Sequence, residues 1–382
     1  MKKFYDIVII GGGIIGCSIA FELAKRGRAD VLIIEREYLT SGATGRCGAG
    51  IRQQWGSAIN AALAYESTHI FEHMEEYTSY SGDCGLNQKG YLLTAYTEKE
   101  WEQFQKNLAV QHSIGIKSYA VDLNGIKEII PHINTEGMYG ACFCEKDGHA
   151  DPFHCTYAYA KGAQAMGVDI ETYTTVTGLT TENGCISTIK TDRGDIQVKT
   201  VLNCTGGHAA IMAEMAGDKL PIYPERHQIL ITEPVAHIMG PMVMSFHRHF
   251  YVQQTPHGSV ILGIGNPKEP VSLNIRSSWQ FLEYAAGLVT QTLPLLRNLN
   301  VVRQWAGLYD MSPDRYPIIN EAEKTKGFIT VAGLSGHGFM VAPRIAILLA
   351  NYLTGQKDSM DIKMFSANRY QIGELIPEPS VV

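Results

Sequence analysis

Three glycines and one carboxylate near the start of the chain have the types and spacing that hold a phosphate-bearing ligand. Gly11, Gly13 and Gly16 fit the pattern G-x-G-x-x-G, and Glu35 follows them by about 20 residues. In this pattern the first glycine makes a tight turn, the second admits a pyrophosphate to the backbone, and the third lets a helix pack closely on a strand. The carboxylate can accept hydrogen bonds from both ribose hydroxyls. These residues therefore predict a dinucleotide site.

The segments around these glycines occur in the order that such a site needs. Residues 5–10 form a short β-branched apolar run, which predicts a buried parallel strand. Residues 14–25 carry apolar side chains at helical spacing and end in cationic residues followed by Gly27, which suits a helix C-terminus. Residues 31–34 predict a second strand, with Glu35 at its carboxyl end. The predicted cofactor contacts in this region are Gly11, Gly13, Ile14, Ile15, Gly16, Glu35 and Arg36.

Two simpler interpretations compete for this N-terminal stretch. Glycine-rich turns between a strand and a helix also occur for steric reasons alone, but strand, glycines, helix and acid together are much more specific. The first three residues and the apolar run that follows also imitate a secretory signal. Asp6 within the run and the absence of a small-residue cleavage site argue against a signal.

The composition excludes several classes of protein. A chain of 382 residues with 45% hydrophobic content is long enough for one large domain or two interleaved domains. The formal net charge of -6 is spread along the chain without a basic stripe, so nucleic acid is not expected as a partner. No apolar run reaches the length of a membrane span. The eight cysteines include one C-x-C and no C-x-x-C, which predicts reduced thiols in a cytoplasmic protein and no metal site.

The rest of the chain alternates between an α/β pattern and strand-rich stretches. Residues 41–54 are too glycine-rich for a helix and too long for a hairpin turn, which predicts a loop held against something flat or charged. Residues 57–77 carry a long helical pattern. The predicted fold is α/β plus α+β, with a Rossmann-like cofactor-binding domain interleaved with a strand-rich substrate-binding domain. The predicted segments are 1-84, 145-216 and 325-382 for the first domain, and 85-144 and 217-324 for the second.

Two later segments repeat the order of strand, glycines and helix. The first, residues 201–209, lies where Thr205 and Gly206 can close over the adenosine half of a dinucleotide. The second begins with a strand at residues 327–333 and continues as a helix through Leu353. The N-terminus of that helix offers unpaired N–H groups and the positive end of the helix dipole.

Several stretches of the chain together resemble a known family. They are G-G-G-I-I-G at residues 11–16, R-C-G-A-G-I-R-Q-Q at 46–54, W-A-G-L-Y-D-M-S-P-D at 305–314 and L-S-G-H-G-F-M at 334–340. The chain resembles the FAD-dependent D-amino-acid-oxidase-like amine oxidoreductases, which include sarcosine oxidase and glycine oxidase. With D-G-H-A-D-P-F at 147–153, these stretches also resemble the β (catalytic) subunit of heteromeric dye-linked L-proline dehydrogenase and its sarcosine oxidase β-subunit relatives.

The resemblance implies that FAD lies along the first domain, with its isoalloxazine ring facing a pocket under the strand-rich domain. The implied reaction is oxidation of a C–N bond, in which a neutral amine gives a hydride to flavin N5 and leaves an imine. Such a site needs a cation for the substrate carboxylate, a desolvated wall that favours the neutral amine, and positive potential near the flavin pyrimidine ring. The further FAD contacts that the resemblance implies are Thr44, Arg46, Cys47, Gly48, Thr205, Gly206, Gly336, His337, Gly338, Phe339 and Met340.

Three residues are the candidates for contact with the substrate. Arg52 matches the arginine that binds the substrate carboxylate in monomeric sarcosine oxidase, and a guanidinium binds a carboxylate in a bidentate fork. Tyr309 lies in the stretch where the family places a residue beside the substrate, and Tyr251 lies on a predicted strand of the substrate domain. The alternatives are a surface ion pair for Arg52 and a packed aromatic ring with a satisfied hydroxyl for each tyrosine.

Two positions depart from monomeric sarcosine oxidase. Position 307 is glycine where that enzyme has the cysteine that attaches FAD covalently, which predicts dissociable FAD. Met340 stands where those oxidases have a lysine, so the details of the carboxylate site differ. The histidines of the strand-rich region have spacings that fit no metal motif, and a structural role is expected for His227, His247, His249 and His257.

Three hypotheses follow. The first is a FAD-dependent dehydrogenase of a small secondary amino acid, with L-proline as the first candidate and sarcosine, glycine, hydroxyproline and opines as alternatives. The resemblance implies that electrons leave through a partner subunit, with FMN at the interface. The second hypothesis is a nicotinamide-dependent dehydrogenase, which gives no role to the 41–54 loop or to the last helix. The third is a non-catalytic, flavin-bearing scaffold subunit.

Overall fold

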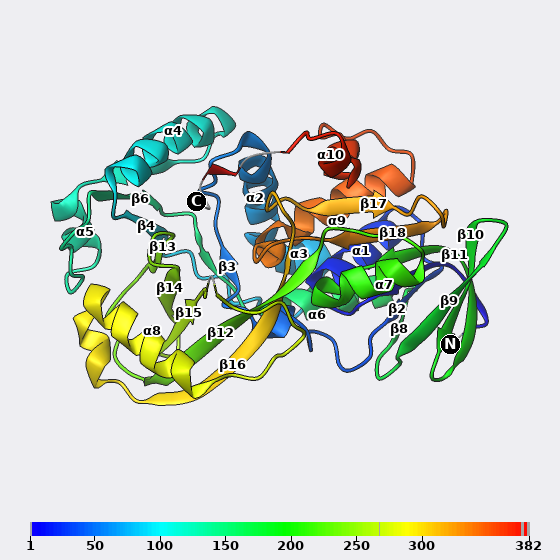
Figure 1. Ribbon diagram of the computed structural model, residues 1–382, viewed down its shortest axis with the longest axis horizontal. Helices are drawn as coiled ribbons and strands as arrows, with labels where there is room; N and C mark the ends of the chain where they lie inside the picture. The colour runs from blue at the N-terminus through cyan, green and yellow to red at the C-terminus, as the bar shows by residue number, and fades with distance from the viewer. Residues whose placement is uncertain (1, 267, 376–377, 380–382) are drawn as a thin grey trace.

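Two large mixed sheets organise the chain (Figure 1). The computed structural model describes residues 2–266, 268–375 and 378–379. The first sheet has the order β17-β18-β11-β1-β2-β8, and β10 and β9 continue from β11. Its strands are β1 (Phe4–Ile10), β2 (Val31–Ile34), β8 (Asp169–Glu171), β9 (Val176–Glu182), β10 (Cys185–Thr191), β11 (Gly194–Asn203), β17 (Ile318–Glu321) and β18 (Phe328–Ala332).

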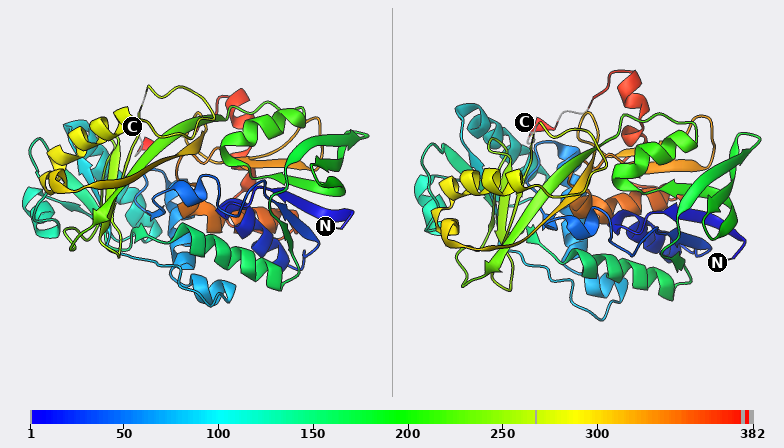
Figure 2. Two further views of the ribbon diagram at one scale, coloured as in Figure 1. Left: turned by 90° about the horizontal axis from the view of Figure 1, so that it is seen from below. Right: turned by 60° about the horizontal axis from the view of Figure 1, so that its bottom comes forward.

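The centre of the first sheet is β1, which pairs in parallel with β2 on one side and with β11 on the other. Ile7 and Ile9 of β1 join one hydrophobic core, and Val8 and Ile10 join another, because successive side chains of a strand point to opposite faces. Helices therefore cover both faces of the sheet (Figures 1 and 2). They are α1 (Ile14–Lys25), α2 (Ala58–Phe71), α6 (Pro152–Ala165) and α9 (Gly338–Leu353) on one face, and α7 (Ala209–Met215) on the other.

The second sheet has the order β16-β12-β15-β14-β13-β4-β6-β5. Its strands are β4 (Tyr91–Ala95), β5 (Ser118–Val121), β6 (Gly140–Cys144), β12 (Tyr223–Pro234), β13 (Met242–Ser245), β14 (Phe250–Gln254), β15 (Ser259–Ile264) and β16 (Val301–Met311). On one face, α4 (Glu98–Ile114) packs against β4 and β6. On the other face lie α5 (Leu123–Ile129) and α8 (Trp279–Thr292). The parallel pairing of β4 with β13 joins two segments that are far apart in the sequence.

The strands of residues 85–144 and of most of 217–324 share the second sheet, and β17 is the exception. The predicted segment 217–324 assigns residues 318–321 to the substrate-binding domain. In the structure β17 instead pairs antiparallel with β18 in the first sheet. The assignment of β17 is corrected for this reason, and the rest of the domain division stays a prediction.

The predicted helix at residues 14–25 and the strand at 31–34 are confirmed, whereas the long helix at 57–77 is interrupted. The helix α2 ends at Phe71, His73 leaves helical geometry with a φ of -131°, and the chain resumes as α3 (Met74–Thr78). Phe71 stacks on Phe339 of α9 with ring centres 5.3 Å apart, and Met74 is fully buried. Tertiary packing sets this break, because no glycine or proline marks it in the sequence.

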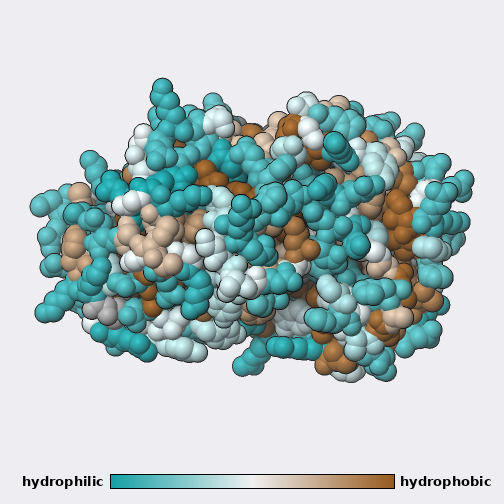
Figure 3. All heavy atoms as spheres, turned by 180° about the vertical axis from the view of Figure 1, so that it is seen from behind, coloured by the Kyte–Doolittle hydropathy of each residue, from teal (hydrophilic) through white to brown (hydrophobic). Residues whose placement is uncertain are grey.

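Smaller elements complete the fold. A two-stranded sheet joins β3 (Gly50–Ile51) to β7 (Gly148–His149). Short helical turns are η1 (Thr44–Arg46), η2 (Gly206–His208), η3 (Pro294–Asn298), η4 (Ile362–Phe365) and α10 (Asn368–Gln371). Across the residues that the structure describes, no helix combines the length and apolar character needed to cross a bilayer. The rear face of the molecule is mostly hydrophilic, with hydrophobic residues in separate patches (Figure 3).

Candidate active site

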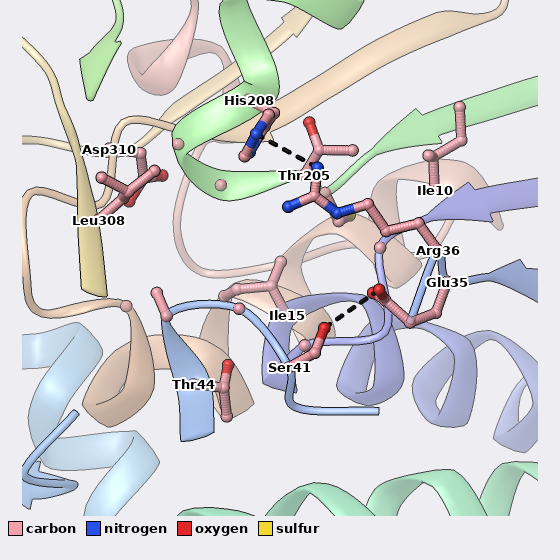
Figure 4. A pocket seen from close by; sticks show the side chains of 18 of the residues that line it. Ile10, Ile15, Glu35, Arg36, Ser41, Thr44, Thr205, His208, Leu308 and Asp310 are labelled. Atoms are coloured by element: carbon pink, nitrogen blue, oxygen red, sulfur yellow. Dashed lines mark hydrogen bonds between the residues drawn. The ribbon is translucent and has the colours of Figure 1, made fainter. Parts of the chain in front are cut away.

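A cavity of about 380 Å³ lies where the carboxyl ends of β1, β2 and β11 meet (Figure 4). Open α/β sheets bind ligands at this edge. The predicted cofactor residues that line the cavity are Gly11, Gly13, Ile14, Ile15, Glu35, Arg36, Thr44, Arg46, Cys47, Thr205, Gly206, Gly336, Gly338 and Phe339. Four of the predicted cofactor residues lie outside this lining: Gly16, Gly48, His337 and Met340.

The first glycine turn leaves no room for side chains at two of its positions. Gly11 has a φ of +116°, and a Cβ there would lie 2.4 Å from the carbonyl oxygen of Cys204. A Cβ on Gly16 would lie 2.1 Å from the carbonyl oxygen of Gly11. Gly16 therefore serves the packing of α1 on the turn, which explains why it lies behind the cavity wall.

The N-terminus of α1 faces the cavity. Gly13 is its N-cap, and both Gly13 and Ile14 line the cavity. Thr44 of the following loop accepts a hydrogen bond from Ile14 N through Oγ1 at 3.2 Å. A helix N-terminus in this position presents backbone N–H groups and the positive end of the helix dipole, which suit a pyrophosphate.

The Glu35 carboxylate is held by its own stretch of chain. Oε2 accepts a hydrogen bond from Gly12 N at 2.8 Å. Oε1 accepts from Glu37 N at 2.9 Å and from the Ser41 hydroxyl at 3.2 Å (Figure 4). Each carboxylate oxygen has two lone pairs, so Oε1 is fully used and Oε2 keeps one acceptor position. Oε2 is therefore the oxygen most open to a ribose hydroxyl, and the prediction that Glu35 accepts both hydroxyls stays a prediction.

At the mouth of the cavity, Arg36 meets a histidine that the sequence analysis missed. Arg36 Nη1 lies 3.3 Å from His208 Nε2, and both side chains line the cavity (Figure 4). Burial and the charge of Arg36 lower the pKa of His208, so a neutral imidazole is favoured there. The sequence signal that leads to His208 is the strand, glycine and helix order at residues 201–209.

The glycine-rich loop at residues 41–54 is fastened to β16 of the second sheet. Arg46 Nη1 donates a hydrogen bond to the carbonyl oxygen of Ala306 at 3.3 Å, and Trp305 Nε1 donates to the carbonyl oxygen of Arg46 at 2.8 Å. Cys47 lies beside this attachment, and burial raises its pKa to about 11, which keeps the thiol protonated. The loop therefore lines the cavity where it passes from the first sheet to the second.

The turn before α9 is also fastened to β16. Asp310 accepts a hydrogen bond from Leu334 N at 3.2 Å through Oδ2, and its main-chain oxygen accepts from Ser335 N at 2.9 Å. Burial raises the pKa of Asp310 to about 6. Gly336 has a φ of +87°, and a Cβ there would lie 2.3 Å from the Tyr309 ring. Asp310 lines the cavity and was missed, although it lies in the 305–314 stretch.

Arg52 is a buried cation, which contradicts the alternative of a surface ion pair. Its side chain is 4% exposed, and its guanidinium carbon lies 3.9 Å from the centre of the Trp55 ring. Nη1 donates to the carbonyl oxygen of Gln54 at 2.5 Å, and burial lowers the pKa of Arg52. Among the residues that the structure describes, no carboxylate lies within 4.0 Å of this guanidinium. A buried charge of this kind is costly unless an anion pairs with it.

The carboxylate near Arg52 is used to hold the loop rather than the guanidinium. Asp147 is fully buried and accepts hydrogen bonds from Gln53 N at 2.8 Å and from Gln54 Nε2 at 2.9 Å. Burial raises the pKa of Asp147 to about 6, although these hydrogen bonds and the charge of Arg52 oppose the shift. Asp147 therefore holds the backbone of Gln53, the residue that follows Arg52.

The Trp55 ring contacts both Arg52 and the N-terminus of α9. His337, the N-cap residue of α9, meets the Trp55 ring edge-on with ring centres 4.8 Å apart. Burial lowers the pKa of His337 to about 4, and the positive charge of Arg52 acts in the same direction. The imidazole is therefore neutral at pH 7. Its Nε2 is buried and has no hydrogen-bond partner within the described part of the chain.

One face of the second sheet directs tyrosines toward the 41–54 loop. A Cβ on Gly48 would lie 3.0 Å from the Tyr251 ring, and a Cβ on Gly50 would lie 1.8 Å from the Tyr91 hydroxyl. Burial raises the pKa of Tyr91, Tyr251 and Tyr309, so all three phenols stay neutral at pH 7. Tyr309 lines the cavity, whereas Tyr251 and Arg52 lie outside its lining. Tyr91 was missed because nothing in the sequence near residue 91 links it to the loop.

The prediction that the histidines of the strand-rich region have no metal-binding role stays a prediction. Within residues 2–266, 268–375 and 378–379, no three His, Cys, Asp or Glu side chains converge as metal ligands do. His227 Nε2 lies 2.8 Å from Glu225, and His247 Nδ1 lies 3.9 Å from Glu100.

The residues of the cavity fit a dinucleotide that carries a flavin. Crowded glycines and the N-terminus of α1 suit its pyrophosphate, and Glu35 offers an acceptor for its ribose. Gly336, Gly338 and Phe339 line the cavity at the N-terminus of α9 and suit the pyrimidine edge of an isoalloxazine ring. Gly307 lies against this region, since a Cβ there would be 3.1 Å from Arg46 Cβ, and glycine offers no thiol for covalent attachment.

Comparisons with known proteins agree with this geometry. Residues 6–352 match the family model described as DAO, FAD dependent oxidoreductase. The chain is 28% identical to sarcosine oxidase subunit beta of Rhodobacter capsulatus, over 99% of this chain and 91% of that protein. Among solved structures it is similar to L-proline dehydrogenase from P. horikoshii, with a TM-score of 0.92, 36% identity, and coverage of 98% of this chain and 100% of that chain.

Glycine oxidase from Bacillus cereus is a further similar structure, with a TM-score of 0.81, 25% identity, and coverage of 93% of this chain and 96% of that chain. These matches confirm the predicted family, the predicted fold class and the use of FAD. The chain belongs to the FAD-dependent oxidoreductase family and is an amino acid oxidoreductase of the sarcosine oxidase, proline dehydrogenase and glycine oxidase type.

Proposed function

We propose that the protein is a dehydrogenase of a small secondary amino acid, with L-proline as the first candidate. The observation that carries this proposal is Arg52, a buried guanidinium with no carboxylate within 4.0 Å among the described residues. A substrate carboxylate would supply the missing anion in a bidentate geometry. The similarity over the whole chain to a solved L-proline dehydrogenase supports the choice of amino acid.

Two tyrosines of the second sheet and the N-terminus of α9 have properties that suit amine oxidation. When bound, FAD supplies the acceptor at N5 for the hydride that leaves the C–H bond beside the amine, which becomes an imine. The amine must be neutral to react. Tyr251 and Tyr309 are half-buried, and the raised pKa of each phenol keeps it neutral, so both can provide an uncharged wall that disfavours an ammonium ion. The N-terminus of α9 provides positive potential without a side-chain charge, because His337 is neutral at pH 7.

A partner subunit belongs to the same proposal. Curated relatives of nearly the same length are named as subunits of sarcosine oxidase, which supports a heteromeric assembly for this chain. We propose that electrons pass to that partner rather than to oxygen, through FMN at the interface. A cytoplasmic location is also proposed, and it is supported by eight cysteines that are all unpaired thiols.

Anaerobic bleaching of the flavin tests this function. The purified holoprotein is mixed without oxygen with L-proline, sarcosine, glycine, hydroxyproline or an opine, and the flavin absorbance is followed. The proposal predicts fast bleaching by L-proline and slow recovery when air is admitted. Bleaching by sarcosine or glycine alone would show that this amino acid, and not L-proline, is the substrate. Rapid hydrogen peroxide formation in air would identify an oxidase.

The alternative of a non-catalytic scaffold makes a different prediction. A scaffold would bind FAD, and none of these amino acids would bleach it in the wild-type protein. The nicotinamide-dependent alternative is excluded by the match to the FAD-dependent family.

The mode of FAD attachment is tested separately. Gly307 provides no thiol beside Arg46, so acid unfolding followed by filtration is expected to separate all of the flavin from the chain. Flavin that stays with the unfolded chain would contradict non-covalent binding and would direct attention to Cys47 at the cavity wall.

A further inference from the structure

We propose that His227 and Glu225 are positioning residues that hold the Tyr309 ring at the wall of the substrate pocket. This inference rests on the proposed function, because it assigns Tyr309 to the wall that the amino acid contacts. The spacing of the histidines in the sequence predicts only a structural role for His227. The geometry of three neighbouring strands gives it a more specific one.

The imidazole of His227 lies flat against the phenol ring of Tyr309. Their ring centres are 3.7 Å apart, and the angle between the ring planes is 16°. His227 Nε2 lies 2.8 Å from Glu225 Oε1, so the carboxylate fixes the direction in which the imidazole points. Stacking and a hydrogen bond together leave the imidazole one favourable orientation.

Three glycines lie beside this arrangement. In the ladder between β12 and β16, Glu225 faces Tyr309 and His227 faces Gly307. His227 is therefore the diagonal neighbour of Tyr309 on the same face of the sheet, which puts the two rings within reach of each other. Gly265, which follows β15, also lies beside the imidazole, since a Cβ built there would be in van der Waals contact with His227 Cε1 at 3.4 Å.

The third glycine touches Tyr309 itself. A Cβ on Gly336 would lie 2.3 Å from Tyr309 Cε2, so the ring lies directly against the turn before α9. Tyr309 is thus held between an imidazole of the second sheet and a backbone turn of the first domain. Its ring lines the cavity at this junction, where a change of ring orientation would alter the pocket wall.

The pair is placed at the edge of the site rather than inside it. The side chains of His227 and Glu225 are 17% and 24% exposed. The hydrogen bond from His227 lowers the pKa of Glu225, and Arg315 acts in the same direction. The carboxylate is therefore ionised at neutral pH and available as the acceptor for the imidazole.

The test separates the stacking from the hydrogen bond and from general stability. Binding of tetrahydrofuran-2-carboxylate, a proline analogue without an oxidisable amine, is measured by calorimetry on the holoprotein. The variants are His227→Ala, His227→Phe and Glu225→Ala. The matched control is His257→Ala, which removes an exposed imidazole from the turn between β14 and β15. The thermal midpoint and the rate of anaerobic flavin reduction by L-proline are recorded for each.

His227→Ala is expected to weaken analogue binding about tenfold, because it removes the stacked ring. His227→Phe keeps a flat ring and is expected to restore most of the affinity. Glu225→Ala is expected to weaken binding about threefold through loss of one hydrogen bond. His257→Ala is expected to change nothing.

A double substitution decides whether His227 acts through Tyr309. In a Tyr309→Leu background, His227→Ala is expected to cause no further loss of affinity. An equal loss in both backgrounds, or a lower thermal midpoint with unchanged affinity in His227→Ala, would overturn the inference. If the wild-type protein neither binds the analogue nor is bleached by an amino acid, the proposed function itself fails.

Discussion

The cofactor edge of the first sheet takes its chemistry from residues 5–35, whereas the tyrosine-bearing face of the second sheet collects residues from across the chain. At the cofactor edge, Gly11, Gly16 and Glu35 are separated by short stretches of one strand–helix–strand unit. On the other face, Tyr91 and Tyr309 come from strands that are more than half the chain apart. The two regions meet at the 41–54 loop and at the turn before α9.

The two regions also differ in the atoms on which they depend: backbone atoms in the first and side chains in the second. The cofactor edge depends on backbone atoms and on the absence of side chains, as the crowded positions of Gly11 and Gly16 show. The substrate face depends on side chains whose ionisation is set by burial, as the pKa shifts of Arg52, Tyr251 and Tyr309 show. Substitutions in the first region should therefore cause steric clashes with large effects on FAD binding. Substitutions in the second region should change the affinity for the amino acid by smaller, graded amounts.

The largest effect is expected at Gly16. A Cβ there would lie 2.1 Å from the Gly11 carbonyl oxygen, so Gly16→Ala must push α1 away from the turn. Overpacking of this kind costs about 1–3 kcal/mol or more. The expected result is a protein that is purified with little or no FAD, as measured by flavin absorbance per chain.

Gly27→Ala is the matched control for Gly16→Ala, because it lies at the other end of the same helix. Gly27 has a φ of +79° and has no atom within 4 Å of a built Cβ. The strain of a left-handed alanine is about 1 kcal/mol, so FAD content should stay normal. Normal FAD content in Gly16→Ala would show that close packing of α1 on the turn is not needed.

The next largest effect is expected at Arg52. Arg52→Met keeps much of the contact with Trp55 but removes the cation that we assign to the substrate carboxylate. Loss of charge-assisted hydrogen bonds worth about 1.5–3 kcal/mol should weaken amino acid binding about ten- to a hundredfold. The dissociation constant from anaerobic flavin reduction measures this effect, and flavin content should be unchanged.

Arg303→Met is the control for Arg52→Met. Arg303 also lies over an indole, with its guanidinium carbon 5.8 Å from the Trp305 ring centre, but it is exposed. Its removal should leave amino acid binding unchanged. A similar loss in both variants would mean that Arg52 does not bind the carboxylate.

A smaller, pH-dependent effect on stability is expected from His337. Its folded pKa of about 4 lies below the ordinary value of 6.5, so the unfolded chain binds this proton first as the pH falls. The contribution is fully present above pH 6.5 and is lost progressively toward pH 4, by about 3 kcal/mol. His337→Gln should therefore lose less free energy of unfolding than the wild type between pH 7 and pH 4.5.

Urea unfolding at both pH values measures this difference for His337. The exposed His257, replaced in the same way, should behave as the wild type does. If His337→Gln loses as much stability as the wild type, the imidazole is not held neutral beside Arg52.

The smallest effect is expected from the Tyr251 hydroxyl. Tyr251→Phe keeps the ring against Gly48 and removes one hydrogen-bonding group, so amino acid binding should weaken about threefold. Tyr159→Phe is the control, since its buried hydroxyl has no partner among the described residues and lies in α6, away from the second sheet. Equal binding in Tyr251→Phe and the wild type would favour the simpler interpretation of a packed aromatic ring.

The sequence predicts the cofactor edge well because its determinants are local. Gly11, Gly13 and Gly16 have spacings fixed by a tight turn, and Glu35 follows at the end of the next strand. The whole-chain resemblance adds Arg52 and Tyr309, and a predicted strand of the second domain adds Tyr251; no spacing links the three to one another.

The sequence does not predict the residues that depend on how distant strands align. Tyr91 reaches the 41–54 loop only through the second sheet, and Asp310 reaches the cavity only because β16 runs beside the turn before α9. His227 touches Tyr309 because β12 and β16 pair in one register, and a shift of one residue would reverse its face. The two hydrogen bonds that Glu35 Oε1 accepts depend on the path of the loop after β2, and the spacing of residues in the sequence does not predict that path.

The most direct test of the account is a crystal structure of the protein with FAD and tetrahydrofuran-2-carboxylate. We expect the carboxylate within hydrogen-bond distance of the Arg52 guanidinium and the ring of the analogue beside Tyr309, with FAD extending along the cavity to Glu35. An analogue bound away from Arg52, with that guanidinium still lacking an anion, would contradict the account.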